Sequence, residues 1–148
     1  MTTINEALTN LHAAVAAVKA ADGPMVAAYG AAFEAALLEW ERFLSLPIRR
    51  RAELSGPSYG YRPPEMEAWP VLCEAARQAA KAYATARRSS MKRVGPRVLA
   101  LHDAARAWEH AVRGECARAP TDGDDARAWQ FLRDKAEAIA EITQFSLN

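Results

Sequence analysis

The sequence predicts an all-α protein, folded as an antiparallel bundle of four to five helices in a single domain over residues 1–148. Three observations support this prediction. Most of the chain consists of alanine-rich segments that each carry one apolar stripe at helical spacing. Gly-Pro pairs separate some of these segments by short turns, which favour antiparallel neighbours. A content of 51% hydrophobic and 25% charged residues is typical of a globular chain with a sizeable core.

The first two helices are predicted over residues 3–21 and 24–45. Thr3 and Glu6 have the spacing of a capping box, in which each side chain satisfies a free backbone N–H at the helix start. The large apolar residues that follow recur at intervals of three and four residues. We expect Gly23 to end the first helix in a left-handed conformation, so that a tight hairpin joins the two helices.

Three further helices are predicted over residues 65–93, 96–118 and 122–145. Because Pro70 lies near the start of the third, we expect a kink there or a true start near Trp69. Gly95, which precedes a proline, repeats the turn signal of the first hairpin. In a hairpin that turns at Gly95, Cys73 and Cys116 stand at nearly the same height, and we expect them to be small buried residues.

Residues 47–64 form the one long segment without a continuous helical pattern, between the second and third predicted helices. It contains four of the eight prolines, two of the seven glycines, four arginines and two tyrosines. A short helical turn through Leu54 is compatible with its first part. Connections of this length are usually functional or disordered, so we expect this loop or the adjacent helix ends to take part in function.

The net charge of +1 conceals an uneven distribution along the chain. Residues 1–48 carry a net charge of −3, residues 49–113 carry +7, and residues 114–148 carry −3. Two interpretations are open: the basic middle region binds an anionic partner, or the acidic terminal helices pack beside it and neutralise it.

Several classes of site are not indicated by the sequence. It has no phosphate-binding glycine loop, His-Glu-x-x-His, Cys-x-x-Cys or nucleophile elbow, so we expect no enzyme, cofactor or metal site. The acidic side chains Asp122, Asp124 and Asp125 are expected to cap a helix start. No apolar run approaches the roughly 18 to 20 residues of a membrane helix, and the first residues lack the order of a signal peptide. We therefore expect a cytoplasmic protein with no membrane partner.

The candidate contact residues are arginines, tyrosines and one lysine in the central loop and at the basic end of the third helix. They are Arg49, Arg50, Arg51, Tyr59, Tyr61, Arg62, Arg87, Arg88, Lys92 and Arg93. Tyrosine and arginine contribute strongly at protein interfaces, and they also bind nucleic acids through stacking and phosphate contacts. The other interpretation is that the loop folds back on the bundle with its arginines solvated.

These residues predict a non-enzymatic binding protein of the adaptor or inhibitor type, which recognises a protein partner. Compact helical domains of this kind are common among phage and mobile-element products. Nucleic-acid binding by the same basic residues is the alternative. Apolar helix faces are also compatible with a homodimer.

Arg97 and His102 form an Arg-x4-His pair that is similar to the Arg-x(4–6)-His signature of the HEPN ribonuclease-like domains. Those domains are all-α and of comparable length, and the resemblance covers two residues. It implies a ribonuclease in which His102 is the general base on a ribose hydroxyl and Arg97 stabilises the phosphoryl charge, usually in a dimer. A ribonuclease is therefore the second alternative.

Overall fold

The computed structural model describes residues 2–57 and 60–148, which are all-helical, as the sequence predicts. The elements are α1 (Ile4–Lys19), α2 (Pro24–Leu44), α3 (Ile48–Leu54), the 3-10 turn η1 (Pro64–Met66), α4 (Ala68–Ser89), α5 (Pro96–Arg118) and α6 (Gly123–Leu147). The described residues therefore contain six α-helices, where the sequence predicted four to five. The additional helix is α3, which occupies the first part of the 47–64 connection.

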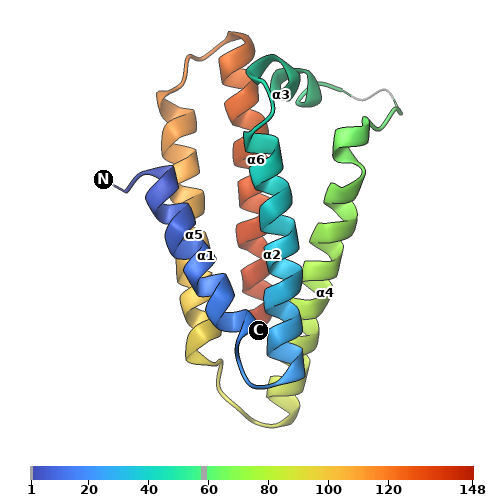
Figure 1. Cartoon of the computed structure of the whole chain (residues 1–148), viewed down its shortest axis with the longest axis vertical. Helices are drawn as coiled ribbons and strands as arrows, with labels where there is room; N and C mark the ends of the chain where they lie inside the picture. The colour runs from blue at the N-terminus through green and yellow to red at the C-terminus, as the bar shows by residue number, and fades with distance from the viewer. Residues whose placement is uncertain (1, 58–59) are drawn as a thin grey trace.

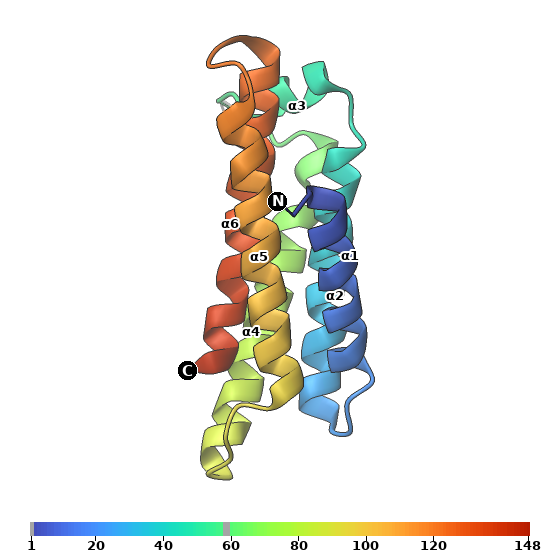
Figure 2. The same ribbon diagram turned by 90° about the vertical axis from the view of Figure 1, so that its left-hand side faces the viewer.

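The five long helices form a closed ring in the order α1, α2, α4, α6, α5, in which each packs against the next and α5 packs against α1. α2 also contacts α6 across the ring. The helices run side by side along the long axis, and the short α3 lies across one end against α6 (Figures 1 and 2). Each long helix buries its apolar stripe toward the centre of this ring.

α2 supplies the aromatic centre of the core. One stripe of this helix is fully buried and holds Tyr29, Phe33, Leu37, Trp40 and Phe43. Trp40 meets Trp108 of α5 edge to face, with ring centroids 4.8 Å apart. The Trp40 indole N–H also donates to the main-chain oxygen of Leu132 in α6, at 2.9 Å. One side chain thus connects three helices, by packing and by a satisfied hydrogen bond.

The start of α1 shows the Thr3 half of the predicted capping box. The Thr3 hydroxyl accepts a hydrogen bond from the Glu6 N–H at 3.1 Å, which satisfies one of the unpaired donors of the first turn. The helix ends at Lys19, earlier than predicted. Gly23, expected to end this helix in a left-handed conformation, does not do so: Ala20 caps the end of α1, and Gly23, with φ of +122° and ψ of 125°, lies directly before α2.

α4 is shorter than the predicted range 65–93. Its first turn contains Pro70, which is tolerated because the N–H groups there have no partner inside the helix. The preceding residues form the separate 3-10 turn η1. The expected start near Trp69 is therefore correct, and the longer helix is wrong.

A left-handed residue ends α4, but it is Met91, with φ of +56°. The Met91 N–H donates to the Arg88 carbonyl and the Lys92 N–H to the Arg87 carbonyl, each at 3.0 Å, which is the Schellman arrangement. Gly95, expected to make this stop, has a φ of −66° and directly precedes α5.

α4 and α5 do not form the expected hairpin. The 90–95 connection crosses the end of the bundle, and α6 packs against both helices from between them (Figure 1). Cys73 in α4 and Cys116 in α5 are free thiols on helices that α6 separates. Cys73 is buried as expected, whereas Cys116 is half-buried. Burial raises the pKa of the Cys73 thiol to about 11, so this thiol stays protonated and unreactive at neutral pH.

Gly30 marks a close approach of α2 to α1, and we predict that Gly30→Ala destabilises the protein. A Cβ atom there would lie 2.6 Å from the Lys19 main-chain nitrogen, so the helices must move apart, at a cost of about 1–3 kcal/mol. Gly114→Ala in α5 is the matched control. Its Cβ would meet only the Arg118 guanidinium at 3.7 Å, so the gain in helix propensity should raise stability by about 0.5–1 kcal/mol. Urea unfolding measures both, and a stabilised Gly30→Ala variant would contradict the close packing of α1 on α2.

Candidate functional site

The structure divides the candidate contact residues between opposite ends of the bundle. The end that carries α3, here called the α3 end (residues 46–66), holds Arg49, Arg50, Arg51, Tyr61 and Arg62. The other end, here called the basic end (residues 21–26 and 83–98), holds Arg87, Arg88, Lys92 and Arg93. α4 connects the two ends and has 22 residues, a length of about 33 Å. The two groups therefore do not form the single surface that the sequence suggested. Tyr59 lies outside the described residues.

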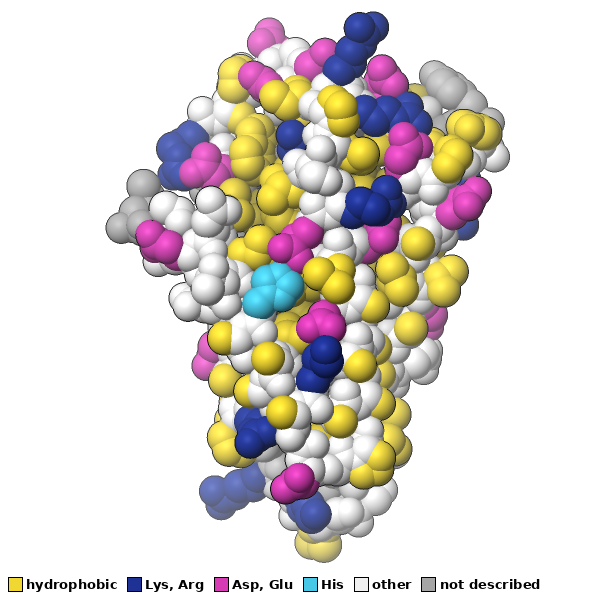
Figure 3. Space-filling view, viewed as in Figure 1, with side chains coloured by type: hydrophobic (Ala, Val, Ile, Leu, Met, Phe, Trp, Pro, Cys, Tyr) yellow, Lys and Arg dark blue, Asp and Glu magenta, His cyan; other side chains and the backbone are white. Residues whose placement is uncertain are grey.

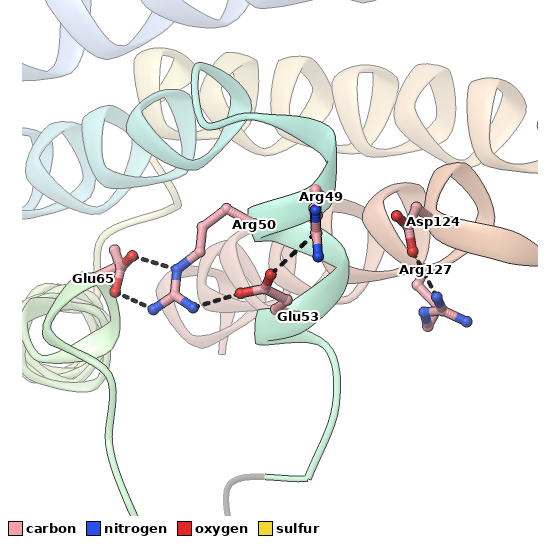
Figure 4. Close-up of polar contacts among 6 residues, drawn as sticks. All are labelled: Arg49, Arg50, Glu53, Glu65, Asp124 and Arg127. Carbon is pink, nitrogen blue, oxygen red and sulfur yellow. Dashed lines mark hydrogen bonds and ion pairs between the residues drawn. The ribbon is translucent and has the colours of Figure 1, made fainter.

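At the α3 end, Arg50 ties α3 to the turn that precedes α4. Its Nε donates to one Glu65 oxygen at 2.5 Å and its Nη2 to the other at 2.8 Å, while its Nη1 donates to Glu53 at 2.9 Å. Figure 4 shows this double fork between α3 and Glu65. The hydrogen bonds from Arg50 lower the pKa of Glu65 to about 2. One guanidinium thus joins the two ends of the 55–63 segment through paired, charge-assisted hydrogen bonds.

Arg51 is placed differently from the expectation that it contacts a partner, because its side chain is buried beneath α3. Its Nε donates to the main-chain oxygen of Leu46 at 3.2 Å. Burial lowers the pKa of Arg51, and the nearby Asp125 carboxylate of α6 opposes this effect. Arg51 therefore anchors α3 to the bundle and offers no surface to a partner.

The remaining described candidates at this end are exposed. The Arg49 side chain is 86% exposed and lies 3.7 Å from Glu53, which makes a weak pair. Tyr61 is 65% exposed, and Arg62 is exposed without an ion pair to any residue that the structure describes. A pocket of about 550 Å³ lies between α3 and the 56–66 segment, and Tyr61 and Arg62 line it. The exposed candidates at this end are therefore Tyr61, Arg49 and Arg62, on or beside a segment whose two ends Arg50 holds together.

At the basic end, the α1–α2 turn, the last turn of α4 and the 90–95 connection surround a second pocket, of about 420 Å³. Three of the predicted residues line it, Arg87, Lys92 and Arg93. Arg88 donates to the main-chain oxygen of Asn148 at 2.6 Å. On the face shown in Figure 3, Lys and Arg side chains lie at both ends of the molecule, and more acidic side chains accompany them at the α3 end.

Arg97 also lines this pocket, and the sequence prediction missed its apolar wall, which includes Tyr83 and Val26. A signal for them was present. Gly-Pro pairs precede both α2 and α5, and alternating helices in an antiparallel bundle bring these two helix starts to the same end. The last turn of α4 must lie there too.

The two residues that resemble the HEPN signature contact different helices. The Arg97 Nη1 donates to the main-chain oxygen of Ala17 in α1, at 2.8 Å. The His102 Nδ1 lies 2.8 Å from the Thr143 hydroxyl of α6. Both side chains therefore have structural partners in the bundle, and the ribonuclease alternative stays a prediction.

We predict that Arg50→Ala raises the pKa of Glu65 from about 2 toward the ordinary glutamate range. With the pKa lowered in the folded state, Glu65 stabilises the fold at pH values above about 4.5, and this contribution is lost as the pH falls toward 2. Arg50→Ala should therefore remove that part of the acid dependence of stability. The measurement is an NMR titration of the glutamate carboxyl carbons together with urea unfolding between pH 2 and 6.

Arg49→Ala is the matched control, because Arg49 has no contact with Glu65 and lies 3.7 Å from Glu53. It removes the same charge from the same helix and should leave the Glu65 pKa low. An unchanged pKa in Arg50→Ala would show that another group stabilises the Glu65 carboxylate.

The described residues contain no group of three or more side chains placed to hold a metal ion. Across residues 2–57 and 60–148, no helix combines the length and apolar character that a membrane crossing requires. Comparison of the chain with protein-family models, with curated proteins and with solved structures finds no match.

Proposed function

We propose that the chain is a non-enzymatic binding protein of the adaptor or inhibitor type, which recognises a protein partner through the α3 end. One observation carries this proposal. Tyr61 and Arg62 are exposed on a segment whose two ends are held together by Arg50. Exposed tyrosine and arginine on a loop whose ends are held together by hydrogen bonds are typical of recognition surfaces.

Preorganisation is the physical advantage of this arrangement. A partner that binds a free loop must offset the entropy lost when the loop and its side chains become ordered, about 0.5–1.5 kcal/mol for each long side chain. The Arg50 hydrogen bonds to Glu65 hold the two ends of this segment together before any partner binds. The Tyr61 ring then offers a large contact area with few rotatable bonds, and Arg62 offers forked hydrogen bonds.

The charges at the α3 end favour a protein over a nucleic acid. The carboxylates of Glu53 and Glu65 lie among the arginines, and Asp124 at the start of α6 lies near α3 (Figure 4). Carboxylates repel a phosphate backbone, whereas a protein surface with both signs of charge complements them. Nucleic-acid binding is therefore the alternative that the following experiment distinguishes from protein binding.

The test is affinity capture from a lysate, with and without nuclease, using the wild type and the double variant Tyr61→Ala with Arg62→Ala. We expect a nuclease-resistant protein partner that the variant fails to retain. The matched control is Arg106→Ala with His110→Ala, which truncates two exposed side chains of α5 and should retain the partner.

With the partner purified, Tyr61→Ala alone should weaken the affinity by about 10- to 30-fold, the effect of removing a hot-spot side chain. Recovery that depends on nucleic acid and falls steeply with salt would replace the proposal by phosphate binding. Equal loss in the α5 control, or no loss in either variant, would place the contact surface elsewhere.

A further inference from the structure

We propose that the basic end is a binding site for a small organic anion, with an apolar body and one carboxylate, sulfonate or phosphate head group. The pocket between the α1–α2 turn, α4 and the 90–95 connection takes the apolar body, and Lys92, Arg93 and Arg97 hold the head group. This site is distinct from the α3 end and does not depend on the protein partner proposed for it.

The pocket has a preformed apolar wall. Val98 is buried at its base, and Val26 and Tyr83 are half-buried beside it. The Tyr83 ring is held in place at two points: one face stacks on Tyr29 with centroids 6.3 Å apart, and its hydroxyl accepts from the Gly95 N–H at 3.0 Å. A volume of about 420 Å³ between helices is in the range of small-ligand sites.

The basic side chains around this pocket lack acidic partners. Elsewhere, most arginines pair with a glutamate or aspartate, as Arg50 does with Glu65. In contrast, Lys92, Arg93 and Arg97 make no ion pair within the described part of the chain. Asp22 is the one acidic residue among those that line the pocket. The pocket therefore carries a net positive charge that the protein itself does not neutralise.

Helix capping explains part of this charge, but not all of it. The guanidinium groups of Arg87 and Arg97 donate to carbonyl oxygens at the ends of α6 and α1, where cations are favoured. The Lys92 and Arg93 side chains have no such role, since they make no hydrogen bond or ion pair with any described residue. The Arg87 Nε is also buried without an acceptor. These groups are donors for which the fold supplies no partner.

The helix ends at the pocket add to the positive potential. α2 and α5 both begin there, at Pro24 and Pro96, and neither start is capped by a side chain. Unpaired N–H groups and the helix dipole favour an anion at such a position. Lys92, Arg93 and Arg97 lie near these helix starts and repel them, and a bound anion relieves that repulsion.

The apolar interior selects an organic anion over a phosphate polymer. A nucleic acid would contact the exposed cations and leave the wall of Val26, Tyr83 and Val98 unused. An anion with an aliphatic chain or ring uses both features, since burial of its apolar body against this wall adds to the attraction of its head group. Decanoate is a suitable probe of this class.

The test titrates the full chain with decanoate and, separately, with decanol, and follows amide shifts by NMR and heat by calorimetry. We expect saturable decanoate binding with shifts in residues 21–26 and 83–98, and binding of decanol at least about tenfold weaker because it lacks the charge. Equal binding of the two probes, shifts outside these residues, or no saturable binding of decanoate would overturn the proposal.

Two variants test the parts of the site separately. Lys92→Glu with Arg93→Glu should weaken decanoate binding by at least about tenfold, whereas Arg49→Glu with Arg62→Glu makes the same charge change at the α3 end and should have little effect. Ala86→Phe fills the pocket without a charge change and should also abolish binding. Equal weakening by both charge reversals would show a non-specific effect of net charge, and full binding by Ala86→Phe would exclude the pocket.

Discussion

The buried aromatic stripe of α2 is the constraint on which the arrangement of the other helices depends. Its large rings fill the centre, so the helices around it present small residues that allow close approach. α4 contributes Ala76, Ala80 and Ala84 to the interior, and α6 contributes Ala136 and Ala140. Between these alanines, the rings of α2 meet aromatic rings of their neighbours, as Trp40 meets Trp108 of α5 and Phe43 meets Phe131 of α6. Trp40, which bonds to α6 and packs on α5, then fixes the height at which these helices meet α2.

Much of the helix content could be predicted because each stripe and each cap depends on residues close together in the sequence. The Thr3 cap and the α2 stripe are examples. The order of helices around the ring could not be predicted, because it depends on which faces fit one another at long range. Arg51 shows a further limit. Arginine is rarely buried, so the residue type predicted that Arg51 is exposed. Its burial follows from the packing of α3 on α6, which the local sequence does not indicate.

The separation of the two ends, by contrast, was available from the sequence. In an antiparallel bundle, the connection before a helix and the connection after it lie at opposite ends. A helix of 22 residues therefore keeps the 47–64 connection about 33 Å from the residues that follow Arg87. The same alternation places both Gly-Pro helix starts beside Arg87. The sequence prediction followed charge along the chain without this geometry. It therefore treated as one surface two groups of basic residues that the fold places at opposite ends.

The two ends use the same residue type in opposite ways. At the α3 end, the Arg50 charge is compensated by Glu53 and Glu65 from the same basic region, so arginine there fixes the shape of the connection. The excess of positive charge between residues 49 and 113 is therefore concentrated at the basic end, where Lys92 and Arg93 have no acidic partner among the described residues. Repulsion between such groups is modest in water and weakens with salt, so the fold tolerates it. Charge that is retained at a small cost in stability, beside a preformed apolar wall, is what distinguishes this end from an ordinary solvated helix terminus.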